Sequence, residues 1–141
     1  MSDLYTGDTK VIELKFKDIK ITKTPRKRTI VSIMNPLFIN NENNKNNKNG
    51  IIIFYAPWCE HCHTLVPIIN ELASLFHQRF TIGAYNIEDE EHDNQKLREY
   101  IRFSYFPLIK HVTKKGILKD YNGTLEKDDL LHFICTNSKC I

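Results

Sequence analysis

The sequence predicts an α/β fold in which helices flank a central mixed β-sheet, and three observations carry this prediction. A continuous apolar run begins at Ile51 and is too short to span a membrane, as expected of a strand covered on both faces. Apolar residues then recur from Leu65 to Phe76 with the spacing of an amphipathic helix. The remainder of the chain predicts a further strand, a helix, a β-hairpin and a final helix, an order that places helices against a mixed sheet.

Two strands are predicted ahead of the central one. Residues Val11–Phe16 alternate apolar and charged side chains, which indicates a half-buried strand. The polar segment Lys23–Arg28 is expected to be a solvated loop, and Thr29–Met34 is expected to be the second strand.

A short helix and a long loop are predicted next. Pro36–Ile39 is expected to start a short helix with Asn35 as its N-cap. Seven of the ten residues Asn40–Asn49 are asparagine, and such a segment has no side chains with which to build a core. It is therefore expected to be a loop between two structured elements.

The predicted elements after the central helix follow from apolar runs and turn residues. Thr124 is the expected N-cap of the last helix, and Lys114, Lys115 and Gly116 are the expected hairpin turn. The predicted elements are a strand at Phe80–Asn86, a helix at Asn94–Tyr100, strands at Pro107–Val112 and Ile117–Tyr121, and a helix at Leu125–Ile134.

Length and composition limit the possible classes of function. A chain of 141 residues is expected to form one main domain, taken as residues 29–141, behind an N-terminal extension of residues 1–28. The net charge of +3 and the lack of a basic stripe argue against a nucleic-acid partner. No segment resembles a signal peptide, membrane span or retention signal, so we expect a cytoplasmic monomer without a membrane partner if Met1 is the natural start.

Cys59 and Cys62 are the candidate reactive residues. A cysteine at a helix start is close to backbone N–H groups that lack intrahelical partners, and these groups stabilise its thiolate and lower the thiol pKa. Cys62 follows almost one helical turn later, near enough to form a disulfide with Cys59. The spacing therefore predicts a pair that cycles between dithiol and disulfide.

The segment FYAPWCEHC, residues 54–62, resembles the active-site segment of the thioredoxin superfamily. It is most similar to the catalytic, a-type domains of protein disulfide isomerases, whose motif reads FYAPWCGHC. The resemblance covers residues 51–134 and implies a thioredoxin fold with an N-terminal β extension. It also implies a thiol-disulfide oxidoreductase without a cofactor, which acts on protein thiols and disulfides and is reset by an unidentified reductase or oxidase. In this chemistry Cys59 is the nucleophile and Cys62 resolves the mixed disulfide.

The resemblance assigns roles to five further residues. Pro107 falls where the superfamily places a cis-proline opposite the cysteine pair, so Phe106 is expected to present its backbone to a substrate strand. A trans-proline at the start of an edge strand is the alternative. Trp58, Glu60 and His61 flank the cysteines and are expected to tune their redox potential. A protonated His61 would stabilise the thiolate of Cys59, whereas Glu60 would oppose it.

Three positions depart from the pattern of the disulfide isomerases. Ile53 stands where the family buries an acid beneath the cysteines, and Ala84 stands where it places a lysine. Thr124 follows Gly123 where those enzymes carry an arginine. Loss of the acid and the lysine together avoids a buried unpaired charge, and the sequence predicts a slow enzyme.

Two alternatives remain open at the level of sequence. The first is a non-catalytic thioredoxin-fold module that binds a partner. The second is a structural zinc site built from Cys59, Cys62 and His63, or from Cys135 and Cys140 as a second pair. We favour no metal, because the apolar strand and Trp58 indicate a packed core and Cys135 is expected on the last helix, away from Cys59. Cys135 is expected to be a buried helix residue and Cys140 a thiol in the tail.

Overall fold

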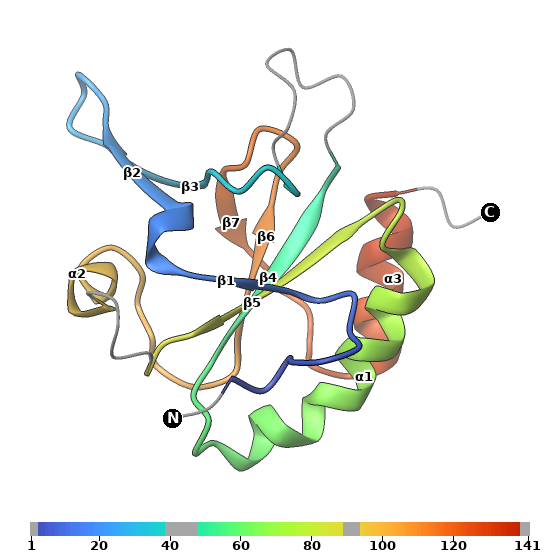
Figure 1. Ribbon diagram of the computed structural model, residues 1–141. Coiled ribbons are helices and arrows are strands. Elements are labelled where there is room, and N and C mark those ends of the chain that lie inside the picture. The colour runs from blue at the N-terminus through green and yellow to red at the C-terminus, as the bar shows by residue number, and fades with distance from the viewer. Residues whose placement is uncertain (1–2, 39–47, 89–93, 139–141) are drawn as a thin grey trace.

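The computed structural model describes residues 3–38, 48–88 and 94–138, and a five-stranded sheet lies at its centre (Figure 1). The strand order is β1-β5-β4-β6-β7. Strands β1, β5 and β4 are parallel, β6 is antiparallel to β4, and β7 is antiparallel to β6. The strands are β1 (Ile12–Leu14), β4 (Gly50–Tyr55), β5 (Thr81–Asn86), β6 (Leu108–Val112) and β7 (Leu118–Asp120). The predicted α/β fold with a mixed sheet is confirmed.

In the part of the chain that the structure describes, three α-helices and one short 3-10 helix accompany the sheet. Figure 1 shows α1 and α3 together on one side of the sheet and α2 on the other. No helix in the described ranges is long and apolar enough to cross a membrane. The helices are η1 (Phe16–Asp18), α1 (Glu60–Phe76), α2 (Asn94–Arg98) and α3 (Lys127–Thr136).

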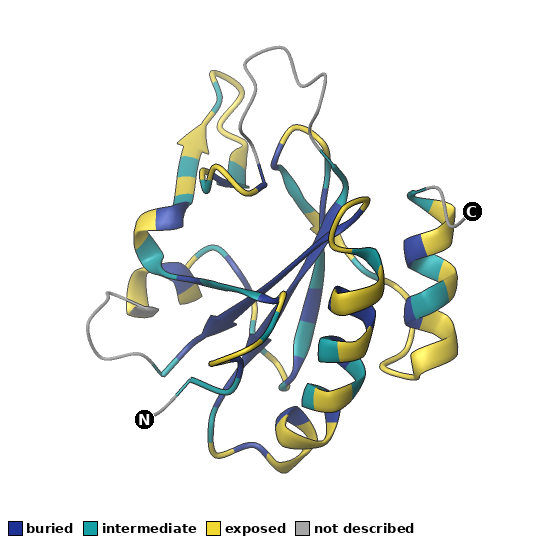
Figure 2. Cartoon of the chain, turned by 45° about the vertical axis from the view of Figure 1, so that its right-hand side comes forward, coloured by how far each residue is buried: buried dark blue, intermediate teal, exposed yellow. Residues whose placement is uncertain are grey.

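The core is built on β4 and β5, which are buried along their whole length (Figure 2). This explains why β4 reads as a continuous apolar run rather than an alternating one. On one face, the ring of Phe54 packs against Tyr85 and Phe103, with ring centroids 5.6 and 5.3 Å apart. Helix α1 contributes a buried stripe that includes Leu65, Ile69 and Leu72, as its helical apolar spacing predicts.

The N-terminal segment is more closely joined to the rest of the fold than an extension would be. Strand β1 lies at one edge of the central sheet and pairs with β5. An additional strand that was not predicted, β2 (Ile19–Lys23), pairs with β3 (Thr29–Ile33) in a separate two-stranded sheet. The polar residues 24–28 form the turn between them, and a boundary at residue 28 would divide this hairpin.

The predicted short helix after β3 is a turn. The Asn35 side chain accepts a hydrogen bond from the Leu37 N–H at 2.9 Å, and the Asn35 carbonyl accepts one from the Phe38 N–H at 2.9 Å. Asn35 therefore caps as expected, but residues 36–38 close a single turn. Ile39 and most of the asparagine-rich segment, residues 40–47, lie outside the described residues.

The last helix begins two residues later than predicted. Its N-cap is Glu126 rather than Thr124. The Thr124 hydroxyl instead donates a hydrogen bond to Asp129 at 2.6 Å and accepts one from the Glu126 N–H at 3.2 Å. These bonds hold the approach to α3 in a turn and leave Leu125 exposed (36%), although it was predicted to pack on the sheet.

Candidate active site

Cys59 lies where the end of β4 turns into α1. It is the N-cap residue of α1, as the sequence predicts, with its backbone extended. The Cys59 N–H donates to the Ala56 carbonyl at 3.0 Å, and the Cys59 carbonyl accepts from the His63 N–H at 3.2 Å. These two hydrogen bonds fix the turn, so the thiol is held at the end of the helix where N–H groups are unpaired.

Cys62 lies beneath Cys59 in the first turn of α1. Both are free thiols, with exposed fractions of 8% for Cys59 and 1% for Cys62. Burial, with a smaller contribution from the hydrogen bond to Cys59, raises the pKa of Cys62 to about 12, against the lowering effect of a backbone hydrogen bond from Ala56. Cys59 is therefore the sulfur that solvent reaches, and Cys62 is a protonated partner in contact with it.

The segment before Pro107, which is distant in the sequence, lies beside the cysteine pair in the structure. The Phe106-Pro107 peptide bond is cis, as the resemblance implied, and not the trans alternative. The Cys59 thiol donates to the Phe106 carbonyl oxygen with an Sγ–O distance of 3.5 Å. The backbone immediately before Pro107 therefore lies directly against the candidate nucleophile.

Aromatic side chains surround this contact. The Trp58 side chain is 59% exposed, and its ring meets that of Phe106 edge-on at 6.0 Å. Phe106 in turn stacks on Phe103 at 5.8 Å. Trp58, Phe106 and Phe103 thus form an apolar surface next to Cys59, which we call the aromatic row.

Glu60 and His61 project into solvent. Both lie at the start of α1, as predicted. Because both are exposed, solvent screens any charge on either side chain. His63, a candidate zinc ligand, directs its Nε2 atom to the Pro57 carbonyl oxygen instead. In the described ranges, no three His, Cys, Asp or Glu side chains are grouped so that they could hold a metal ion.

Cys135 differs from its prediction. It is exposed on α3 and is disulfide-bonded, so it is neither a buried thiol nor part of the site at Cys59. The buried residues of α3 are Leu130 and Ile134, and Cys135, one residue after Ile134, lies about 100° around the helix from it. Cys140 lies outside the described residues.

The departures Ile53 and Ala84 are neighbours in the sheet. Ile53 on β4 pairs in register with Ala84 on β5, and both are buried. Ala84 also pairs with Glu13 on β1, so the three residues form one row across the sheet. Residues in one row direct their side chains to the same face. Glu13 therefore places a carboxyl group on the same face as Ile53, two strands away.

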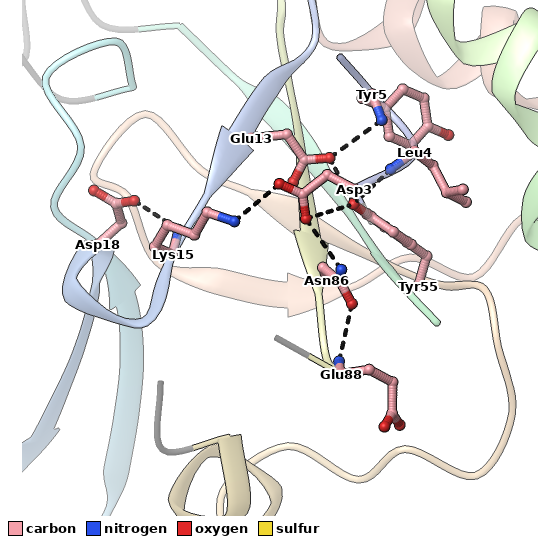
Figure 3. Close-up of polar contacts among 9 residues, drawn as sticks. All are labelled: Asp3, Leu4, Tyr5, Glu13, Lys15, Asp18, Tyr55, Asn86 and Glu88. Atoms are coloured by element: carbon pink, nitrogen blue, oxygen red, sulfur yellow. Dashed lines mark hydrogen bonds and ion pairs between the residues drawn. The ribbon is translucent and has the colours of Figure 1, made fainter. Parts of the chain in front are cut away.

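Glu13 belongs to a polar network that sequence reasoning missed (Figure 3). Its Oε1 atom accepts a hydrogen bond from the Tyr55 hydroxyl at 2.6 Å and from the Tyr5 N–H at 3.3 Å. Burial raises the pKa of Glu13 to about 7, against the lowering effect of the hydrogen bond from Tyr55. The alternation of apolar and charged residues in β1 predicts that Glu13 faces solvent. The N-terminal segment folds over Glu13 and covers it instead.

Asp3 completes this network. The Asp3 carboxylate accepts hydrogen bonds from Lys15 and Asn86, each at 3.0 Å. The Leu4 N–H donates to the Tyr55 hydroxyl at 3.1 Å. Residues 3–5, which we call the N-terminal arm, are thereby tied to β1, β4 and β5.

The sequence is similar to those of known thioredoxin-fold proteins. The thioredoxin family model matches residues 30–136. The chain is 33% identical over 124 residues to protein disulfide isomerase-like 2-1 of Oryza sativa, covering 87% of this chain and 32% of that protein. It is 34% identical over 95 residues to protein disulfide-isomerase 1 of Dictyostelium discoideum, covering 65% of this chain and 26% of that protein. The chain thus spans about a third or less of the length of these relatives.

Solved structures show the same fold. The J-Trx1 fragment of ERdj5 matches with a TM-score of 0.59 and 21% identity, covering 90% of this chain and 51% of that one. Human ERp44 matches with a TM-score of 0.61 and 16% identity, covering 94% of this chain and 30% of that one. Together with the cysteine pair at the start of α1 and the cis-proline beside it, these similarities show that the chain belongs to the thioredoxin family, with relatives among the disulfide isomerases.

Proposed function

We propose that this domain is a thiol-disulfide oxidoreductase that exchanges disulfides with protein substrates through Cys59 and Cys62. The observation that carries the proposal is the arrangement of two free, hydrogen-bonded thiols at a helix start, with the more exposed one against the backbone before a cis-proline. The relatives named protein disulfide isomerase support the same reaction class.

The exchange proceeds in two steps. The Cys59 thiolate attacks a substrate disulfide, forms a mixed disulfide and expels one substrate thiolate. Cys62 then loses its proton and attacks the Cys59 sulfur, which forms the Cys59–Cys62 disulfide and expels the second substrate thiolate. Two electrons pass to the substrate, and the protons of the two cysteines end on the two substrate sulfurs. The reverse sequence makes a disulfide in a substrate, and a reductase or oxidase that exchanges with the pair sets the direction.

The aromatic row gives the substrate a place to bind. A peptide backbone that lies along Phe106 brings its disulfide to Cys59, because the Phe106 carbonyl is already in contact with that sulfur. Trp58 offers an exposed apolar ring beside the same point. Glu60 and His61, which are both exposed, modulate the charge around Cys59 only weakly in water.

Reduction of insulin by dithiothreitol tests the proposed activity. The domain should accelerate the precipitation of reduced insulin chains, and Cys59→Ser should reduce the rate to that of dithiothreitol alone. Cys135→Ser is the matched control, because Cys135 is exposed on α3 and disulfide-bonded. If the wild-type domain showed no activity, the proposal would fail and the domain would be better explained as a non-catalytic binding module.

A further inference from the structure

A positively charged hairpin projects from the domain, away from the cysteine pair. It consists of β2, β3 and the turn between them, and we call residues 19–33 the basic hairpin. Figure 1 and Figure 2 both show it extending away from the start of α1. The segment contains no acidic residue and five exposed cations, Lys20, Lys23, Arg26, Lys27 and Arg28.

The charge of the basic hairpin is not neutralised by its surroundings. Among the described residues, none of the five cations forms an ion pair with a carboxylate. Asp18 directly precedes the hairpin, but it is buried, and its carboxylate accepts hydrogen bonds from the Lys15 N–H at 2.8 Å and the Asn35 side chain at 3.3 Å. Five like charges therefore repel one another in solvent, and an acidic partner would relieve that repulsion.

The turn at the tip holds a lysine in a conformation that favours glycine. The Lys27 N–H donates to the Thr24 carbonyl at 2.9 Å, and Lys27 has a φ of 62°. A hairpin loop of this kind is a turn followed by one residue in the left-handed region, which is usually glycine. A side chain there lowers stability. Lys27 thus adds a charge at the tip while it makes the fold less stable.

Strand β2 has a free edge. On one side it pairs with β3, which is joined to the loop before β7 by the Ile33 N–H bond to the Gly116 carbonyl at 2.8 Å. On the other side, no strand in the described ranges pairs with β2. Lysines on such an edge prevent pairing with a second copy, since both edges carry the same charge, but the same lysines attract an acidic strand.

The register shows which backbone groups face this edge. The Thr24 N–H donates to the Arg28 carbonyl at 2.8 Å, so these two residues are a hydrogen-bonded pair at the end of the β2–β3 ladder. Hydrogen-bonded and non-hydrogen-bonded pairs alternate along an antiparallel ladder. The N–H and carbonyl groups of Lys23 and Ile21 therefore point to the free edge, where an extended peptide can pair with them.

The composition of the hairpin favours a polypeptide over other anionic partners. It has no aromatic side chain on which nucleic-acid bases could stack. None of its large apolar side chains is exposed, so it presents no group that would enter a lipid bilayer. An acidic strand, in contrast, would use both the free backbone groups and the cations.

We propose that the basic hairpin is a docking surface for an acidic segment of a partner polypeptide, which binds in an extended conformation along the free edge of β2. The backbone of the segment pairs with Ile21 and Lys23, and its carboxylates lie against the exposed cations. The surface is separate from Cys59, so the proposal goes beyond the proposed function and does not depend on it.

Fluorescence anisotropy with a labelled peptide of alternating glutamate and valine tests the role of charge. A Lys23→Gln, Lys27→Gln variant should bind it about fivefold more weakly or worse, the size expected for the loss of two exposed ion pairs. Lys10→Gln, Arg102→Gln is the matched control, because it removes the same charge from exposed positions outside the hairpin. Its affinity should stay within about twofold of the wild type. Equal losses in the two variants would overturn the proposal.

Hydrogen exchange followed by nuclear magnetic resonance tests the backbone pairing. Bound peptide should protect the amides of Ile21 and Lys23, whereas those of Lys20 and Thr22, which face β3, should change little. The same peptide methylated at every backbone nitrogen keeps its carboxylates and should bind at least about fivefold more weakly. Equal binding of the methylated peptide would overturn the proposal. So would tighter binding of single-stranded DNA or of phosphatidylserine vesicles at the same ionic strength.

Lys27→Gly separates binding from stability. Glycine removes the strain at a φ of 62°, so the midpoint of chemical denaturation should rise. The loss of the charge should weaken binding of the acidic peptide at the same time. Unchanged or tighter binding by this variant would contradict the proposal.

Discussion

The sulfur of Cys59 lies 3.5 Å from the carbonyl oxygen of Phe106, although 47 residues separate them in the chain. The contact joins the start of α1 to the approach to β6, two elements that the central sheet brings together. It places the backbone that would bind a substrate strand at the atom that would react with it. If the proposed function holds, substrate binding and chemistry take place at this contact, and variants of single residues around it should affect one more than the other.

Trp58→Ala should weaken substrate binding more than chemistry. The Trp58 ring is 59% exposed and extends the aromatic row beside Cys59. We expect KM for a peptide disulfide to rise about fivefold or more, while kcat and reactivity toward dithiobis(nitrobenzoate) change little. Leu75→Ala is the control, because Leu75 is 64% exposed at the far end of α1. An equal fall in reactivity toward the small disulfide would show that Trp58 acts on the sulfur instead.

Cys62→Ser should trap the first intermediate. Cys59 can still attack a substrate disulfide, but no second thiol is present to release the product. Mass spectrometry without reductant should detect a mixed disulfide at Cys59, and dithiothreitol should remove it. Cys59→Ser should form no such adduct, because the remaining Cys62 is 1% exposed. Equal adduct formation by both variants would contradict the assigned order of attack.

Glu13 should make the stability of the domain depend on pH. Burial, aided by the nearby charge of Asp3, raises the pKa of Glu13 from an ordinary value of 4.5 to about 7. The hydrogen bonds from Tyr55 and the Tyr5 backbone and the charge of Lys15 act in the opposite direction. A raised folded-state pKa favours the neutral form. Its contribution to stability is therefore complete below about pH 4.5 and is lost as the pH rises to about 7, by up to roughly 3 kcal/mol.

Chemical denaturation of Glu13→Gln tests this sign. The amide keeps an oxygen that can accept from Tyr55 and Tyr5 but does not ionise. Relative to the wild type, the variant should gain free energy of unfolding between about pH 5 and about pH 8. Glu71→Gln is the control, because Glu71 is exposed in an ion pair with Lys127. A stability difference that does not change with pH, or that changes in the opposite direction, would show that Glu13 is not destabilised by ionisation.

The core and the surface ion pairs should contribute unequally to stability. Leu72 is fully buried on α1, and Leu72→Ala should lower the free energy of unfolding by about 2–5 kcal/mol through lost burial and the cavity left behind. Lys127 and Glu71 form a 2.8 Å ion pair on the surface, and Lys127→Ala should cost no more than about 1 kcal/mol. Comparable losses for the two variants in a denaturant titration would contradict this division.

Local patterns predicted the centre of the fold because each of its elements satisfies its own rule. The apolar run of β4, the helical spacing in α1 and the proline before β6 can each be recognised from a short stretch of consecutive residues. The structure accordingly places Cys59, Cys62 and Pro107 together as expected.

The N-terminal contributions were not predictable in the same way. Glu13 alternates with apolar neighbours and so reads as a solvated side chain, and Tyr5 lies in a segment without periodicity. Both contact Tyr55, a residue far along the chain, through a hydrogen bond to Glu13 and a ring contact with Tyr5. Likewise, Cys135 lies next to the buried Ile134 on α3 but about 100° around the helix from it, so its exposure depends on which face of α3 packs on the sheet.

The direct measurement of the central claim is insulin reduction by the wild-type domain and by Cys59→Ser under identical concentrations of dithiothreitol. Catalysed turnover by the wild type, reduced in Cys59→Ser to the rate of dithiothreitol alone, is the predicted result. Equal rates for the two proteins, whether both fast or both at the uncatalysed level, would contradict the assignment of Cys59 as the nucleophile of a thiol-disulfide oxidoreductase.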